Sequence, residues 1–185
     1  MNRMHAIVLL ALVAGTIAPM YCQVQGNVGP GMVHTRNQFT ITAKAPYEKV
    51  FPLFGALEEK KWAEGWAPFF LHPSPPHDQQ GMVFTVAGAG TSSVWTNTAF
   101  DASTGHVQYV YVVTDTMVTL VDIHVTRAGA TETKVEVVYE RTALKPEAND
   151  RVNHFAKGDA KTGPLWERAI NAYLTKAQTS PATSK

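Results

Sequence analysis

The sequence contains a single cysteine, Cys22, among its 185 residues. An intramolecular disulfide is therefore excluded, and the fold must be stabilised by packing even if the chain meets an oxidising compartment. Because Cys22 precedes the expected folded domain, no thiol nucleophile is predicted there. A Gly-x-Ser-x-Gly elbow, which would indicate a serine nucleophile, is also missing from the sequence. Covalent catalysis of these two kinds is not expected.

Runs of like charge are missing as well. The 16 lysines and arginines and the 15 aspartates and glutamates are scattered along the chain. Such a pattern offers no electrostatic footprint for nucleic acid or for an anionic membrane. We therefore expect neither as a partner, and nothing in the sequence indicates an oligomeric state.

Long hydrophobic runs are lacking too. The apolar run from Ala6 to Ala18 is too short to span a bilayer comfortably, and Arg3 precedes it. This pattern predicts an export signal over residues 1–22, with cleavage between 22 and 26. The expected product is a secreted or periplasmic protein with no integral membrane span. An uncleaved anchor and a lipid-modified Cys22 are the less favoured alternatives.

Residues 33–178 are predicted to form one α+β domain, followed by a disordered tail over 179–185. Alternating and β-branched residues predict a first strand, two short helices and then six further strands joined by turns. The strands are expected at 33–43, 65–71, 81–87, 91–100, 106–114, 117–127 and 131–142, and the helices at 45–55 and 57–62. Such closely spaced strands favour an antiparallel sheet, because a parallel sheet needs crossover helices.

The stretch Pro146–Ala177 carries one apolar stripe at helical spacing. Its members are Val152, Phe155, Ala156, Trp166, Ile170, Tyr173 and Leu174. The stripe keeps the same phase on both sides of Gly163-Pro164, which predicts one long helix with a kink rather than two helices. This helix is the largest apolar surface available to cover the apolar face of the sheet. A sheet that curls around such a helix leaves gaps, so a cavity is expected.

The element order resembles that of the helix-grip superfamily, which includes START domains, Bet v 1-like proteins and polyketide cyclase/dehydrase-like (SRPBCC) proteins. Four sequence segments carry the resemblance, namely ITAKAPYEKVFPLF, WAEGWAPFFLHP, ALKPEANDRVNHF and PLWERAINAYL. The resemblance implies a curved seven-stranded antiparallel sheet around a long C-terminal helix, with two short helices after strand one. It also implies a deep hydrophobic pocket that binds lipids, steroids, hormones or aromatic compounds. A minority of the superfamily are cyclases or hydratases.

The residues expected to line this pocket are the aromatic and apolar ones on the inner faces of strands and helix. They are Trp62, Trp66, Tyr109, Tyr111, Val137, Tyr139, Arg141, Phe155, Trp166 and Ile170. A few polar groups in an apolar wall would orient a ligand that carries a carboxylate or a carbonyl. Alternatively the aromatic side chains pack the core. For Arg141 a solvated position is preferred, since charged groups are rarely buried without a partner.

Two groups of polar residues suggest metal binding or acid/base catalysis. His72, His77 and Asp78 could be metal ligands, but a proline-rich surface loop is the preferred interpretation and no metal site is predicted. Asp122 and His124 could form an acid/base pair. Because Val121 and Ile123 suit the core better, the favoured position of this pair is the solvated outer face.

These observations lead to three hypotheses. The favoured one is an exported protein that binds a hydrophobic small molecule or a lipid in an internal cavity, without a cofactor and with no catalytic residue assigned. The second is a cyclase- or dehydratase-like enzyme that uses cavity tyrosine or histidine side chains as acid/base groups. The third is an interaction module with a filled core and no cavity.

Overall fold

The computed structural model of the chain describes residues 31–88 and 91–179. The predicted export signal, Cys22 and the last six residues of the predicted tail lie outside the described residues. No helix within the described ranges combines the length and the apolar character needed to cross a membrane.

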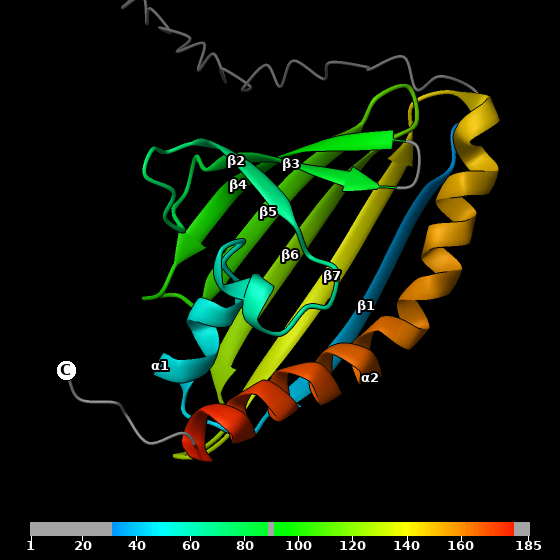
Figure 1. Cartoon of the computed structure of the whole chain (residues 1–185). Coiled ribbons are helices and arrows are strands. Elements are labelled where there is room, and N and C mark those ends of the chain that lie inside the picture. The colour runs from blue at the N-terminus through cyan, green and yellow to red at the C-terminus, as the bar shows by residue number, and fades with distance from the viewer. Residues whose placement is uncertain (1–30, 89–90, 180–185) are drawn as a thin grey trace, which may run out of the picture.

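The described residues form one curved antiparallel sheet with helical elements on its concave side (Figure 1). Seven strands follow the order β1-β7-β6-β5-β4-β3-β2. Their bounds are β1 His34–Ala43, β2 Pro68–His72, β3 Val83–Gly88, β4 Thr91–Asp101, β5 His106–Val113, β6 Met117–Arg127 and β7 Thr133–Ala143. The short helical elements are α1 Tyr47–Val50, the 3-10 turns η1 Phe51–Phe54 and η2 Glu58–Lys61, and η3 Pro146–Ala148. The predicted fold class is confirmed.

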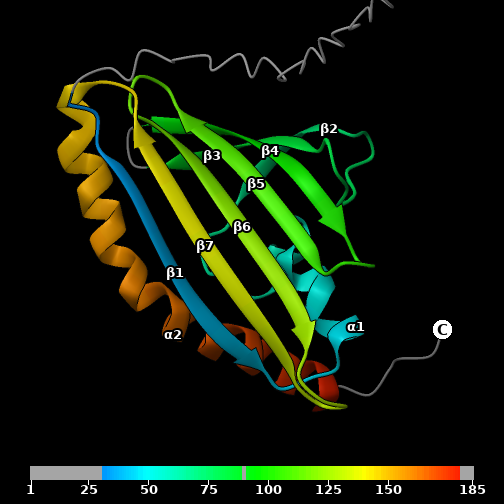
Figure 2. The ribbon, with the colours of Figure 1, turned by 180° about the vertical axis from the view of Figure 1, so that it is seen from behind.

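The long helix α2 runs from Asn149 to Thr179 and contains Pro164. Its axis bends part-way along, so that it follows the curved sheet rather than leaving it (Figures 1 and 2). The apolar stripe faces inward at Val152, Ile170 and Leu174, which are all buried. The prediction of a single kinked helix is confirmed, because the missing N–H of a proline interrupts the hydrogen-bond ladder without ending the helix.

Side chains of α2 bond to the open edge of the sheet. Strand β1 is an edge strand, so one row of its backbone groups has no neighbouring strand. The Thr42 N–H donates to Glu167 Oε2 at 2.9 Å, and the Lys44 N–H donates to Asn171 Oδ1 at 2.7 Å. In return, Asn171 Nδ2 donates to the Thr42 carbonyl at 2.9 Å. These bonds satisfy the edge and hold the C-terminal half of α2 beside β1.

Gly163 lets the middle of α2 approach β1 closely. A Cβ at this position would lie 3.0 Å from the Phe39 ring. Phe39 in turn packs edge-on against Trp166, with ring centroids 5.6 Å apart, and lies beside Tyr139. The glycine therefore brings the Trp166 indole over the inner face of the sheet, where it lines a cavity.

Candidate functional site

A cavity of about 230 Å³ lies between the inner face of the sheet, the segment 59–66 and α2. All four tryptophans of the chain line it. Its lining consists of Glu59, Trp62, Ala63, Glu64, Gly65, Trp66, Trp95, Tyr109, Val121, Ile123, Tyr139 and Trp166. We call it the tryptophan cavity. An apolar, aromatic enclosure with a few polar groups is the usual form of a small-molecule site.

Most of the indole N–H groups around this cavity already have acceptors. The bonds run from Trp62 to the Leu53 carbonyl at 2.7 Å, from Trp66 to the Ala56 carbonyl at 2.8 Å and from Trp95 to Ser93 Oγ at 2.8 Å. Such bonds satisfy the polar end of a buried indole and fix the ring. These three tryptophans therefore offer apolar ring surface to a ligand rather than free donors.

Glu59 places a carboxyl group in this aromatic wall. The residue is 8% exposed, and no described residue forms a hydrogen bond or an ion pair with its carboxyl group. Burial raises the pKa of Glu59 well above its ordinary value, and the nearby Asp78 carboxyl adds to this effect. The carboxyl group therefore keeps its proton to a higher pH than an exposed glutamic acid, and in that form its O–H can donate to a ligand.

Two tyrosines also bring hydroxyl groups to the wall of the tryptophan cavity. The Tyr109 hydroxyl donates to the Phe54 carbonyl at 2.8 Å, so it anchors the short helical segment to the sheet. The Tyr139 hydroxyl has no hydrogen-bond partner among the described residues. Burial raises the pKa of Tyr139. Glu59 and Tyr139 thus supply the cavity with uncommitted polar groups.

A second cavity of about 280 Å³ lies beside the first and shares the lining residues Trp95 and Tyr139 with it. Its polar wall is formed by Arg141 on β7 and Asp159 on α2. The two side chains form a bidentate ion pair, with Nη1 to Oδ2 at 2.5 Å and Nη2 to Oδ1 at 2.9 Å. Asn37 Nδ2 also donates to Asp159 Oδ2, at 2.9 Å.

The expectation that Arg141 is solvated is wrong. Arg141 is 4% exposed, and Asp159 is 5% exposed. The physical reason is the paired carboxylate on α2, since a buried guanidinium is tolerated when a bidentate partner neutralises it. The guanidinium also lies over the Tyr139 ring, 4.4 Å from the ring centroid.

Trp95 connects the tryptophan cavity and the second cavity to a third one of about 350 Å³. Its indole stacks on Tyr111 with ring centroids 4.0 Å apart and an interplanar angle of 18°. Trp95 lines all three cavities, and Tyr111 and Phe155 line the second and the third. Trp95 therefore lies where the three cavities meet.

Solved structures match this fold over most of the chain, whereas no protein-family model and no curated protein matches the sequence. A norcoclaurine synthase point mutant from Thalictrum flavum matches with a TM-score of 0.62 at 11% identity, over 80% of this chain and 98% of that one. The ZhuI aromatase/cyclase from Streptomyces sp. R1128 matches with a TM-score of 0.58 at 13% identity, over 83% and 100%. Ara h 8.0201 matches with a TM-score of 0.52 at 15% identity, over 78% and 99%. The chain has the helix-grip fold of Bet v 1-like proteins.

The helix-grip fold brings most of the predicted pocket residues together. Trp62, Trp66, Tyr109, Tyr139 and Trp166 line the tryptophan cavity. Tyr111, Tyr139, Arg141 and Phe155 line the second cavity. Val137 and Ile170 are fully buried in the core and line none of the three cavities. A ligand-binding role for each of these residues stays a prediction.

Among the lining residues that were not predicted from the sequence, the ones that matter most to the site are Glu59, Trp95 and Asp159. Trp95 carried a usable signal, since it lies in a predicted strand and aromatic residues favour the buried face of a sheet. Glu59 lies within a run of four charged residues, Glu58 to Lys61. Nothing in that run marks the one side chain that turns inward.

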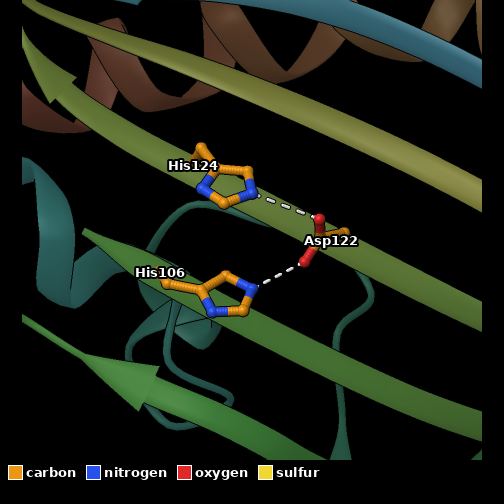
Figure 3. Close-up of side chains that lie close together, drawn as sticks. All are labelled: His106, Asp122 and His124. Atoms are coloured by element: carbon orange, nitrogen blue, oxygen red, sulfur yellow. Dashed lines mark hydrogen bonds and ion pairs between the residues drawn. The ribbon is translucent and has the colours of Figure 1, made fainter. Parts of the chain in front are cut away.

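His72 ends β2, and His77 and Asp78 in the segment that follows it bond to other groups of the fold. Asp78 Oδ1 accepts the Leu57 N–H at 3.0 Å, and His77 Nε2 lies 2.7 Å from Gln79 Oε1. Among the described residues, the His and acidic side chains close enough to share an ion are His106, Asp122 and His124 (Figure 3). They lie on the outer face, as predicted for Asp122 and His124, while the inward neighbours Val121 and Ile123 are buried.

Proposed function

We propose that this protein binds a compact hydrophobic molecule of aromatic character in the tryptophan cavity, and that Glu59 meets the polar end of that molecule. The single observation that carries the proposal is the composition of the cavity wall. It combines every tryptophan of the chain with one buried carboxyl group that has no partner among the described residues.

The physical argument for binding is the free energy that the cavity costs the fold when no ligand occupies it. Burial removes most of the contact between Glu59 and water, and no described residue replaces it with a hydrogen bond to the carboxyl group, which disfavours the ionised form. A ligand that offers a carbonyl or hydroxyl group to Glu59 and apolar surface to the indoles removes that cost and gains the burial energy of its rings. The favoured ligand is therefore an apolar molecule with one hydrogen-bonding end.

The size and lining of the cavity favour a compact aromatic molecule over an extended lipid. A volume of about 230 Å³ corresponds to roughly eight water molecules at about 30 Å³ each. Among the solved structures with this fold, a norcoclaurine synthase from Thalictrum flavum is in complex with dopamine and hydroxybenzaldehyde, two aromatic compounds. A lipid would need the neighbouring cavities as well, and this is the alternative within the same class of function.

Export remains part of the proposal and rests on the sequence alone. The apolar segment after Arg3 predicts a secreted or periplasmic protein, which would meet its ligand outside the cytoplasm. Amino-terminal sequencing of the protein recovered from its own host would test this. A start between residues 22 and 27 is expected, and an intact Met1 would contradict export by a cleaved signal.

A second candidate function is an enzyme of the cyclase or dehydratase type. Glu59 favours it, because a carboxyl group with a raised pKa in an apolar site is suited to general acid catalysis. The unbonded Tyr139 hydroxyl supplies a second proton-transfer group in the same cavity. Incubation of an identified ligand with the wild type and with Glu59→Gln, followed by mass analysis of the products, would separate turnover from binding.

The test of the binding proposal is native mass spectrometry of the protein purified from its own host, compared with a variant whose cavity is filled. Val121 lies on the cavity floor and is 3% exposed, so Val121→Phe would place a ring in the ligand space. Leu120→Phe, on the opposite face of the same strand, is the matched control. We expect an apolar adduct on the wild type and on Leu120→Phe, and its loss from Val121→Phe.

A second readout is needed if the ligand is lost during purification. Displacement of the fluorescent probe 1-aminoanthracene by a panel of aromatic and lipid compounds provides this second readout of binding. If neither method detects binding that depends on Val121, the proposed function is wrong.

A further inference from the structure

The outer face of the sheet, away from the cavities, carries a cluster of two histidines and one aspartate. His106 on β5 lies directly opposite His124 on β6 in the strand register. Asp122 precedes His124 by two residues, so it projects from the same face of β6. The register of an antiparallel pair therefore brings three potential metal ligands from two strands together (Figure 3).

The contacts within this cluster are short. His106 Nε2 lies 2.7 Å from Asp122 Oδ1, and His124 Nε2 lies 3.2 Å from Asp122 Oδ2. The two imidazole rings are parallel within 3°, with centroids 4.8 Å apart. One ligand atom from each of the three residues lies within 4.8 Å of the others. Both histidines thus direct the same ring nitrogen toward one carboxylate, as the close-up shows.

The charges around the cluster favour a cation. Gln108 Nε2 donates to Asp122 Oδ1 at 3.0 Å, so this oxygen acts as an acceptor, as a carboxylate oxygen does. In the strand register Asp101 lies beside His106, and Glu136 lies beside His124, so the row is flanked by acidic residues. Lys134 lies on the same face of β7, two residues from Glu136 and opposite Thr126.

We propose that His106, Asp122 and His124 bind a divalent transition-metal ion such as Zn²⁺ at the outer face of the sheet. Two imidazole nitrogens and one carboxylate are a ligand set that suits zinc and its neighbours rather than magnesium or calcium. Three protein ligands leave a further coordination position to water, because the cluster faces solvent. The site is separate from the proposed ligand cavity and does not depend on it.

Ligation requires a modest rearrangement of the two rings. A metal ion lies about 2.0–2.1 Å from each ligating imidazole nitrogen and near the plane of the ring. The stacked rings must therefore tilt toward one another, and the half-exposed side chain of His124 has room to do so. Each Nε2 must also present its lone pair to the metal, so a neutral ring must carry its hydrogen on Nδ1 in the metal-bound form.

The competing interpretation is a hydrogen-bonded cluster that fastens β5 to β6. Gln108 Nε2 also donates to Asp122 Oδ1, at 3.0 Å, so the carboxylate is well satisfied without a metal. Both interpretations predict some loss of stability when Asp122 is replaced. They differ in that only a metal site gives a zinc-dependent signal which disappears with either histidine.

The experiment is isothermal titration of the untagged full chain with zinc chloride, followed by a thermal melt with and without zinc. The variants are His106→Gln, His124→Gln and Asp122→Asn, which keep side-chain size and polarity. His77→Gln, an exposed loop histidine bonded to Gln79, is the matched control. Cobalt(II) absorption in the visible range provides a second readout of ligation by nitrogen and oxygen.

We expect one zinc ion per chain for the wild type and for His77→Gln. Loss of a group that merely orients a metal ligand already costs about 10–100-fold in affinity, so each cluster variant should bind at least about tenfold more weakly. Zinc should raise the melting temperature of the wild type and not that of the cluster variants. Absence of zinc binding by the wild type would overturn the proposal, and so would equal binding by wild type and cluster variants or equal weakening by His77→Gln.

Discussion

The carboxylate of Asp159 on α2 accepts two hydrogen bonds, of 2.5 and 2.9 Å, from the guanidinium of Arg141 on β7. Both residues are almost wholly buried. The pair joins the N-terminal half of the long helix to β7, the second strand from the β1 edge, while Glu167 and Asn171 bond the C-terminal half of the helix beside β1. The ion pair therefore fixes the wall that separates the second cavity from the edge of the sheet.

Removal of one partner of the Arg141–Asp159 pair should strongly destabilise the fold. Asp159→Asn leaves Arg141 buried without a counter-charge, and we expect it to lower the free energy of unfolding by about 3–5 kcal/mol. Glu140→Gln breaks the exposed pair with Arg36 and is the matched control, with almost no change expected. Urea denaturation followed by circular dichroism measures both. Equal effects of the two substitutions would contradict the buried role of the Arg141 pair.

Glu59 should give the protein a pH-dependent stability of a definite sign. Its pKa is raised in the folded state, so the folded protein holds the proton more tightly than the unfolded chain. The stability is then fully present below the ordinary glutamate pKa of about 4.3 and declines as the pH rises toward the folded-state value. Glu59→Gln should remove this decline. The free energy of unfolding of Glu59→Gln should therefore exceed that of the wild type by an amount that grows as the pH rises.

The measurement for Glu59 is urea denaturation at a series of pH values from 5 to 9 for the wild type and Glu59→Gln. Glu64→Gln, at an exposed residue of the same cavity, serves as the control and should keep the wild-type slope. Asp78 contributes a slope of the same sign, because burial also raises its pKa, and it is present in every variant. Parallel curves for the wild type and Glu59→Gln would mean that the Glu59 carboxyl group is not desolvated.

The elements that could be predicted from the sequence are those with a regular period. The stripe of α2 kept one phase across Pro164, and β6 alternates between Val121 or Ile123 inside and Asp122 outside. The inner face of β4 was harder to assign, because the buried position beside Trp95 is the polar Asn97 and the register shifts between Asn97 and Ala99. Such a shift changes the face on which later residues lie.

The inward position of Glu59 and the burial of Arg141 could not be predicted, for two physical reasons. Glu59 lies in a 3-10 turn, whose period of three residues differs from that of an α-helix, so helical spacing does not identify its inward side chain. Arg141 is buried because Asp159, 18 residues away, reaches it from α2. The register between a strand and a packed helix is a tertiary property that one sequence does not reveal.

Two glycines of α2 should respond to alanine in opposite ways. A Cβ at Gly158 meets no atom within 4 Å, so Gly158→Ala should stabilise the helix by about 0.5–1 kcal/mol through its better helix propensity. A Cβ at Gly163 would lie 3.0 Å from Phe39, so Gly163→Ala must displace that ring. The disturbed packing should cancel the stabilisation that the better helix propensity of alanine would give. Thermal and urea denaturation compare the two. A gain at both positions would show that Phe39 does not limit the approach of the helix.

Trp95 should set the length of ligand that the protein accepts. Trp95 lines all three cavities, so we expect its replacement in Trp95→Ala to join them. For the wild type, affinity for a series of alkylbenzenes should rise by about 0.8 kcal/mol per methylene and then level off once the tryptophan cavity is full. In Trp95→Ala the rise should continue to longer chains. Displacement of 1-aminoanthracene measures the series.

Trp95→Phe is the control for the alkylbenzene series, since it retains a ring to stack on Tyr111. Loss of the indole should also cost about 3 kcal/mol of stability, as large-to-small substitutions in packed regions do, so binding must be measured at a temperature where Trp95→Ala is folded. The phenylalanine variant should level off near the wild-type chain length. If the alanine variant levels off at that same length, Trp95 does not separate the cavities, because removing a partition must lengthen the space available to the alkyl chain.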